Sequence, residues 1–200
     1  MPRLAVAILV LLLALTRWHA YDPVTWWLEV APVIAALPFL WAFGARGRLS
    51  NFLLIVVVLH ATVLMVGGHY TYALAPPGEW VRALGIGMRN NYDKLGHFMQ
   101  GFTPVLVIRE VFVRSGDWKT RPVFLGTLAV LAAGGISALY EVIEMTAALA
   151  MGQGADAFLG TQGYVWDTQT DMATALVGAL VAVFFLPGLH ARSIARSTKA

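Results

Sequence analysis

The chain contains no cysteine and few charged residues, and both shortages restrict what it can be. Without cysteine it forms no disulfide, and thiolates supply neither a metal site nor redox chemistry. Only 12% of its 200 residues are charged, about half the share of a soluble domain, whereas 58% are hydrophobic. The sequence therefore predicts an integral membrane protein whose partner is the lipid bilayer.

Six apolar segments predict an all-α, polytopic membrane helical bundle of about six transmembrane helices, forming a single domain over residues 1–200. Four of them have the ~20 residues needed to cross the hydrocarbon core. The first is the shortest, and because bulky residues follow it in place of a small-residue cleavage site, we interpret it as a retained helix. The predicted helices cover residues 4–20, 24–43, 51–73, 93–113, 122–150 and 167–187.

Lysine and arginine are distributed unevenly between the two ends of this bundle. Nine fall on the side that carries both termini and four on the other side, with Arg109 inside a helix. Because such residues are enriched in cytoplasmic loops, both termini are predicted to be cytoplasmic. Trp26, Trp27, Trp80 and Trp166 would then form an aromatic belt at the outer interface. The formal net charge of +3 is small, so we expect no nucleic-acid partner, and the sequence indicates no particular protein partner.

Residues 75–92 connect the third and fourth predicted helices on the outer side. Prolines near the start of this connection prevent a continuous helix. The stretch "EWVRALGIGM" is compatible with a short amphipathic segment lying in the membrane interface. A simple loop is an equally good interpretation.

Three pairs of polar residues occur near the outer ends of the last three predicted helices. The pairs are Asp93 with His97, Glu141 with Glu144, and Asp167 with Asp171. Spacings of three and four residues place both members of a pair on one helix face. Counting about 1.5 Å per residue from each helix start puts all three pairs in the outer third of the membrane.

The shared depth of these pairs predicts a functional site. Charged residues inside membrane helices cost about 2.5–3.5 kcal/mol each and usually face the bundle interior. Five neighbouring carboxylates repel one another, and Lys94 and His97 are too few to neutralise them. The site is therefore expected to hold protons or a cation. Carboxylates with one imidazole suit a divalent metal ion such as Mg²⁺, Mn²⁺ or Zn²⁺, and a carboxyl–carboxylate pair suits acid–base chemistry.

Roles can be assigned to these residues as hypotheses. The candidate catalytic residues are Glu141, Glu144 and Asp167, and the candidate metal ligands are Asp93, His97, Glu144 and Asp171. Further candidates for the same site are Gln162, Gln169 and Glu29. Any one pair alone is also compatible with an interface anchor, and Asp167 with a helix N-cap. The convergence of three pairs favours the shared site.

The stretches "YDKLGHFMQGF", "YEVIE" and "FLGTQGYVWDTQTDM" resemble, in this order, the YjdF-like family of bacterial inner-membrane proteins. The resemblance extends over most of the chain and implies a multi-pass location in the bacterial inner membrane, but no established activity. The family pattern reads GTQGD, so Tyr164 stands where relatives carry an aspartate and supplies no carboxylate. A more distant resemblance to VanZ-like membrane proteins implies envelope-related work on the outer face.

Three functions stay open on the sequence alone. The first is a metal-assisted hydrolase or transferase acting on a lipid or another amphiphile, although the chain has no HExxH motif and no serine or cysteine nucleophile constellation. The second is a non-catalytic membrane subunit or binding protein whose acidic cluster fixes helix packing. The third is a cation- or proton-coupled transporter, for which His60 is the one candidate continuation toward the cytoplasm.

Overall fold

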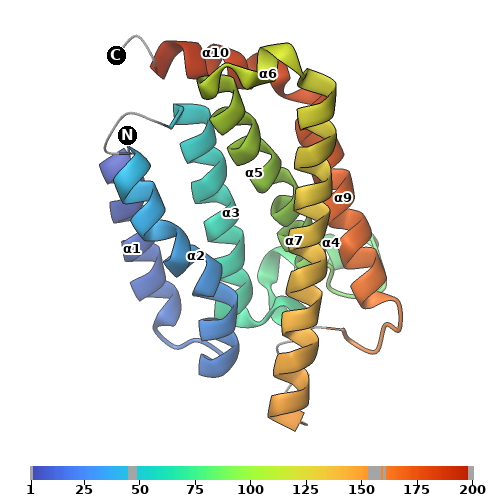
Figure 1. The fold of residues 1–200 in the computed structure, drawn as a ribbon. Coiled ribbons are helices and arrows are strands. Elements are labelled where there is room, and N and C mark those ends of the chain that lie inside the picture. The colour runs from blue at the N-terminus through green and yellow to red at the C-terminus, as the bar shows by residue number, and fades with distance from the viewer. Residues whose placement is uncertain (1, 45–48, 153–158, 160, 198–200) are drawn as a thin grey trace.

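The computed structural model describes residues 2–44, 49–152, 159 and 161–197, and in these residues the chain is helical with short connections (Figure 1). Within them, six long helices run along a common direction: α1 (Pro2–Arg17), α2 (Pro23–Gly44), α3 (Asn51–Tyr70), α5 (Tyr92–Ser115), α7 (Pro122–Met151) and α9 (Asp167–Phe185). The shorter elements are η1 (Tyr72–Leu74), α4 (Pro76–Ala83), α6 (Asp117–Thr120) and α10 (Pro187–Ser197).

The long helices confirm the prediction of an all-α membrane bundle. Each predicted segment corresponds to one long helix, and α2, α3, α7 and α9 are long and apolar enough to cross a membrane. The third helix ends earlier than predicted, at Tyr70, because Thr71 adopts a φ of 59° that no α-helix accommodates. The helical interpretation of the 75–92 connection is correct for its first part, where α4 begins with proline at its first positions.

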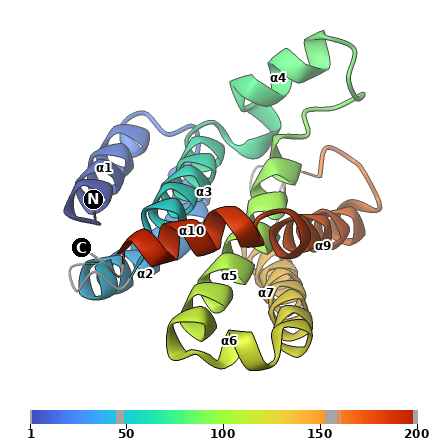
Figure 2. The same ribbon diagram turned by 90° about the horizontal axis from the view of Figure 1, so that it is seen from above.

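The last helix was not predicted. Phe185 ends α9, and Pro187 opens α10, which carries two arginines and no long apolar run. In the view from above, α10 crosses the ends of α3 and α9 (Figure 2). It lies at the same end of the bundle as α6 and as both ends of the chain (Figure 1).

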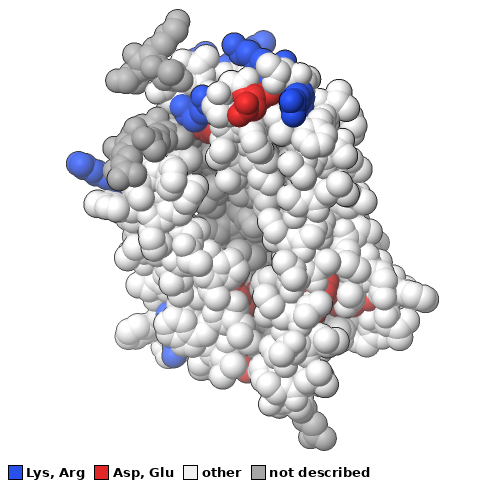
Figure 3. All heavy atoms as spheres, in the orientation of Figure 1, with Lys and Arg blue, Asp and Glu red and all other residues white. Residues whose placement is uncertain are grey.

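Basic side chains gather at the α6–α10 end, as the space-filling view shows (Figure 3). The described basic residues counted on this side are Arg3, Arg114, Lys119, Arg121, Arg192 and Arg196. Three others counted on this side, Arg46, Arg48 and Lys199, lie outside the described residues. The end that carries the termini is therefore also a basic end.

Helix α5 forms the centre of the bundle, packing against α3, α7 and α9. Its approach to α9 depends on two glycines. A Cβ on Gly101 would overlap the carbonyl group of Ala175, and a Cβ on Gly178 would overlap the carbonyl oxygen of Phe98. The two backbones thus touch, which brings the polar starts of α5 and α9 together.

The predicted aromatic belt was wrong for one residue. Trp26 is 3% exposed, because the start of α2 packs against α1 and α3, and its indole N–H donates to Thr16 Oγ1 over 3.2 Å. Trp27, Trp80 and Trp166 are exposed, as residues at a membrane interface would be.

Candidate functional site

Five of the six predicted pair members meet in one buried cluster at the end of the bundle opposite α10. His97 lies between two of them: its Nε2 is 3.5 Å from Asp171 Oδ1, and its Nδ1 is 3.8 Å from Glu141 Oε1. Asp93 and Asp167 complete the cluster, and all five side chains are buried. The sixth, Glu144, is half-buried and lines a neighbouring cavity.

Lys94 binds the three aspartates at once. Its Nζ lies 2.6 Å from Asp171 Oδ1, 2.9 Å from Asp167 Oδ1 and 3.3 Å from Asp93 Oδ2. The carboxylate oxygens of these aspartates lie close enough together to hold a metal ion. However, the Lys94 ammonium already contacts all three carboxylates. These aspartates are therefore less suitable as metal ligands than the second group, which includes His97.

Arg89 supplies a second positive charge that the sequence interpretation did not include. Its guanidinium donates to Asp167, and its Nη2 lies 3.8 Å from Asp93 Oδ2. The same guanidinium lies over the Tyr164 ring, 4.7 Å from the ring centroid, which is a cation–π distance. Two cations therefore face three aspartates, and the only available signal was the i,i+4 spacing of Arg89 and Asp93.

The second group that can hold a metal ion consists of His97, Glu141 and Asp171. One ligand atom from each lies within 4.8 Å of the others. Glu141 Oε1 is buried and has no hydrogen-bond partner in the described part of the chain. His97 Nδ1 lies 3.1 Å from Gln100 Oε1, so in the tautomer protonated at Nδ1 the ring donates to Gln100 and keeps its Nε2 lone pair toward Asp171.

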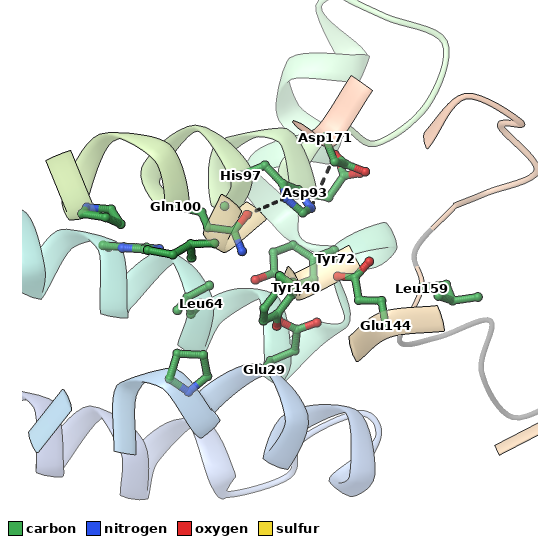
Figure 4. Close-up of a pocket in the computed structure, with 15 residues that line it drawn as sticks. Glu29, Leu64, Tyr72, Asp93, His97, Gln100, Tyr140, Glu144, Leu159 and Asp171 are labelled. Carbon is green, nitrogen blue, oxygen red and sulfur yellow. Dashed lines mark hydrogen bonds and ion pairs between the residues drawn. The ribbon is translucent and has the colours of Figure 1, made fainter. Parts of the chain in front are cut away.

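A cavity of about 220 Å³ adjoins this cluster. Figure 4 shows His97 and Asp171 at one end of it and Glu29 with Glu144 at the other. Glu29 is 1% exposed, and its Oε2 accepts a hydrogen bond from the Tyr140 hydroxyl over 3.2 Å. Tyr72 also lines the cavity, and burial raises the pKa of its phenol well above the ordinary value, so this group stays neutral.

A second, larger hollow of about 310 Å³ adjoins this cavity and lies along α2, α3 and α5. The two share Pro32, His60 and Leu64 in their linings. Among the described residues that line the larger hollow, His60 and Thr103 are the polar ones, and the rest are apolar; we call it the apolar groove. Figure 3 shows the surface hollowed between α2 and α7, with acidic atoms at the lower end.

The remaining candidates occupy different places. Gln162 exchanges two hydrogen bonds with the backbone of Asn90, at 2.7 and 3.2 Å, and so joins the segment before α9 to the segment before α5. Gln169 is exposed and does not line the cavity. Asp167 is the first residue of α9 rather than its N-cap, which is Trp166, and its carboxylate binds Arg89 and Lys94.

The fold and the site together define a polytopic helical membrane protein with a buried acidic and histidine cluster at one end. Residues 1–192 match the model of a family described as "Predicted membrane protein (DUF2238)", and the chain belongs to this family. It is also 50% identical over 192 residues to inner membrane protein YjdF of Escherichia coli (strain K12), covering 94% of this chain and 90% of that protein. No solved structure matches.

These comparisons confirm the YjdF-like resemblance and a multi-pass location in the inner membrane. They state no activity for the family. Neither match supports the more distant VanZ-like resemblance.

Proposed function

We propose that this protein is a membrane-embedded hydrolase or transferase that acts, with a divalent metal ion, on the polar head of a lipid or another amphiphile. The observation that carries the proposal is that the cavity beside the His97 cluster and the apolar groove adjoin, sharing three lining residues. A polar head and an apolar chain require such a pair of environments side by side.

The proposal includes a topology. All six long helices cross the membrane as a single domain, and the basic α6–α10 end faces the cytoplasm together with both termini. The acidic and histidine cluster then opens toward the outer leaflet. Supporting this orientation, the basic residues of α6, α10 and the ends of the neighbouring helices are concentrated at one end.

The chemistry follows from the donor types. One imidazole and two carboxylates, from His97, Glu141 and Asp171, match the ligand sets of catalytic divalent ions. When bound, such an ion activates a water molecule and polarises the bond to be cleaved. Glu144, across the cavity from Asp171, is the candidate acid or base because it lines the cavity and belongs to neither metal-binding group.

Two observations favour this function over its alternatives. A cation pathway to the cytoplasmic end would require a series of polar groups, whereas the described lining of the apolar groove is largely aliphatic and aromatic. A purely structural cluster would be satisfied internally, whereas Glu29 Oε1 and Glu141 Oε1 are buried without a hydrogen-bond partner among the described residues.

The metal-binding part of the proposal predicts which variants lose the ion. Protein purified in detergent and loaded with Zn²⁺ or Mn²⁺ is expected to retain one ion per chain after desalting, measured by elemental mass spectrometry. Asp171→Asn and Glu141→Gln should lose most of it, because each removes one of three ligands. Glu144→Gln is the matched control and should retain it. Equal retention in all three variants, or none in the wild type, would contradict the assignment.

The catalytic part predicts a change in membrane amphiphiles. An Escherichia coli strain lacking its YjdF protein is expected to accumulate the substrate, visible as a changed lipid profile by mass spectrometry. Expression of this chain should restore the profile, whereas His97→Ala should not, because it removes the residue between Asp171 and Glu141. The exposed Gln169→Ala variant is the control. Identical profiles with and without the protein would rule out a catalytic role on lipids.

A further inference from the structure

We infer that the ligand of this cavity is an amphiphile whose head carries a protonated amine, held between Glu29 and Glu144, with its chain in the apolar groove. This inference rests on the proposed function, because it names the substrate class of the same cavity. It is carried by the end of the cavity that Glu29 and Glu144 line.

An unpartnered acceptor points into this end of the cavity. Glu29 is 1% exposed, and although its Oε2 accepts from the Tyr140 hydroxyl, its Oε1 has no hydrogen-bond partner among the described residues. Figure 4 shows the Glu29 carboxylate directed toward Tyr140 inside the lining of the cavity. Because leaving a buried carboxylate oxygen without a donor is costly, a ligand that brings an N–H group would be stabilised here.

This end of the cavity also lacks a basic partner for its two carboxyl groups. Of the described residues that line the cavity, none is lysine or arginine. Lys94 and Arg89 bind the aspartates on the other side of His97. Glu144 lines the same cavity as Glu29 (Figure 4). A positively charged ligand would therefore supply the counter-charge that the described lining lacks.

The surroundings favour an ammonium group over a bare metal ion at this end. The carboxylates lie beside the aromatic rings of Tyr72 and Tyr140, and Figure 4 shows Glu144 directed toward both. Aromatic faces attract ammonium groups, whereas a divalent ion requires several oxygen or nitrogen ligands around it. The nearby lining includes Pro32 and Leu64, which suit the carbon atoms next to an amine.

The apolar groove distinguishes an amphiphile from a soluble amine. It begins at Pro32 and Leu64, which it shares with the cavity, and continues past Val33, Leu40 and Val57. Helix α2 packs against α1 and α3, and α7 packs against α5 and α9, so the side between α2 and α7 lies open where the surface is hollowed (Figure 3). A chain attached to the amine has a path into the bilayer through this opening.

The test is a binding measurement that requires no turnover. The full chain in an uncharged maltoside detergent is titrated with oleylamine, oleyl alcohol, oleic acid and propylamine, and complexes are counted by native mass spectrometry. Oleylamine is expected to bind one-to-one and at least about tenfold more tightly than oleyl alcohol, because only the amine donates a charged hydrogen bond. Glu29→Gln and Glu144→Gln should each weaken oleylamine by about tenfold. Glu79→Gln, on α4 outside the cavity, should not.

Each other outcome has a definite meaning. Equal affinity for oleylamine and oleyl alcohol in the wild type overturns the inference, whether or not the glutamate variants fold. Propylamine binding as tightly as oleylamine overturns the amphiphile part, because the site then recognises a soluble amine. The metal-retention measurement tests the proposed function separately. If Asp171→Asn and Glu141→Gln keep the ion, the proposed metal site is wrong, whatever the result with oleylamine. Glu79 is a suitable control because the hydrogen bond from Arg82 lowers the pKa of its carboxyl and keeps it charged.

Discussion

Replacing Lys94 with methionine is expected to lower the free energy of unfolding by about 3–5 kcal/mol, the cost of leaving buried charges without their partner. The Lys94 ammonium contacts Asp93, Asp167 and Asp171 within 3.3 Å, and these carboxylates are 6%, 6% and 3% exposed. Methionine keeps a side chain of similar length without the charge. The melting temperature, followed by circular dichroism in detergent, should fall on the order of 10 °C.

A second substitution separates lost charge from lost packing. In the Lys94→Met background, Asp171→Asn removes one of the unbalanced carboxylates and should recover part of the lost stability. Lys119→Met makes the same change at an exposed lysine and should leave the melting temperature unchanged. The ammonium does not hold the aspartates together if Lys94→Met has the melting temperature of the wild type. The same conclusion follows if adding Asp171→Asn lowers the melting temperature of Lys94→Met further.

Hydropathy was sufficient to predict the long helices, but the helix across the end of the bundle depends on distant contacts. The apolar segments at 24–43 and 122–150 differ from α2 and α7 by a residue or so at each end. Helix α10 has a largely polar sequence, and it docks because His190 binds Glu110, 80 residues earlier in the chain. No local pattern marks such a contact, so it could not be predicted from one sequence.

The candidate site was predictable to the extent that helical periodicity determines it. The spacing of Asp93 and His97 correctly placed both on the buried face of α5. The spacing of Glu141 and Glu144 was less informative, because residues three apart point about 60° apart around the helix. That difference directs Glu141 to His97 and leaves Glu144 to the cavity.

The neighbours that complete the site carry no such signal. Arg89 precedes α5 in a connection without regular structure, so its direction toward Asp167 follows from the fold alone. Tyr72 and Tyr140 come from different helical elements and meet at the cavity only after α3 and α7 have packed around α5. Periodicity predicts which residues share one face of a helix, whereas these contacts depend on how the helices pack against one another.

At the opposite end of the bundle, one carboxylate holds three helices together. Glu110 of α5 accepts hydrogen bonds from the backbone N–H and the hydroxyl of Ser50, both over 2.6 Å, at the start of α3. It also accepts from Arg114 over 2.7 Å and lies 2.9 Å from His190 Nε2 on α10. The side chain is buried, so these partners replace water around its charge.

Glu110→Gln should therefore destabilise the protein about as much as Lys94→Met, by about 3–5 kcal/mol, because Arg114 loses its counter-charge and the amide cannot accept from every present donor. Helix α10 should also become more mobile, measured as faster hydrogen–deuterium exchange in its peptides. Asp117→Asn, an exposed carboxylate at the same end, is the matched control. Metal retention should stay at the wild-type level, since Glu110 lies at the far end of α5 from His97. A variant that loses the ion without loosening α10 would mean that the two ends of the bundle are coupled, and that Glu110 serves the site rather than the docking of the last helix.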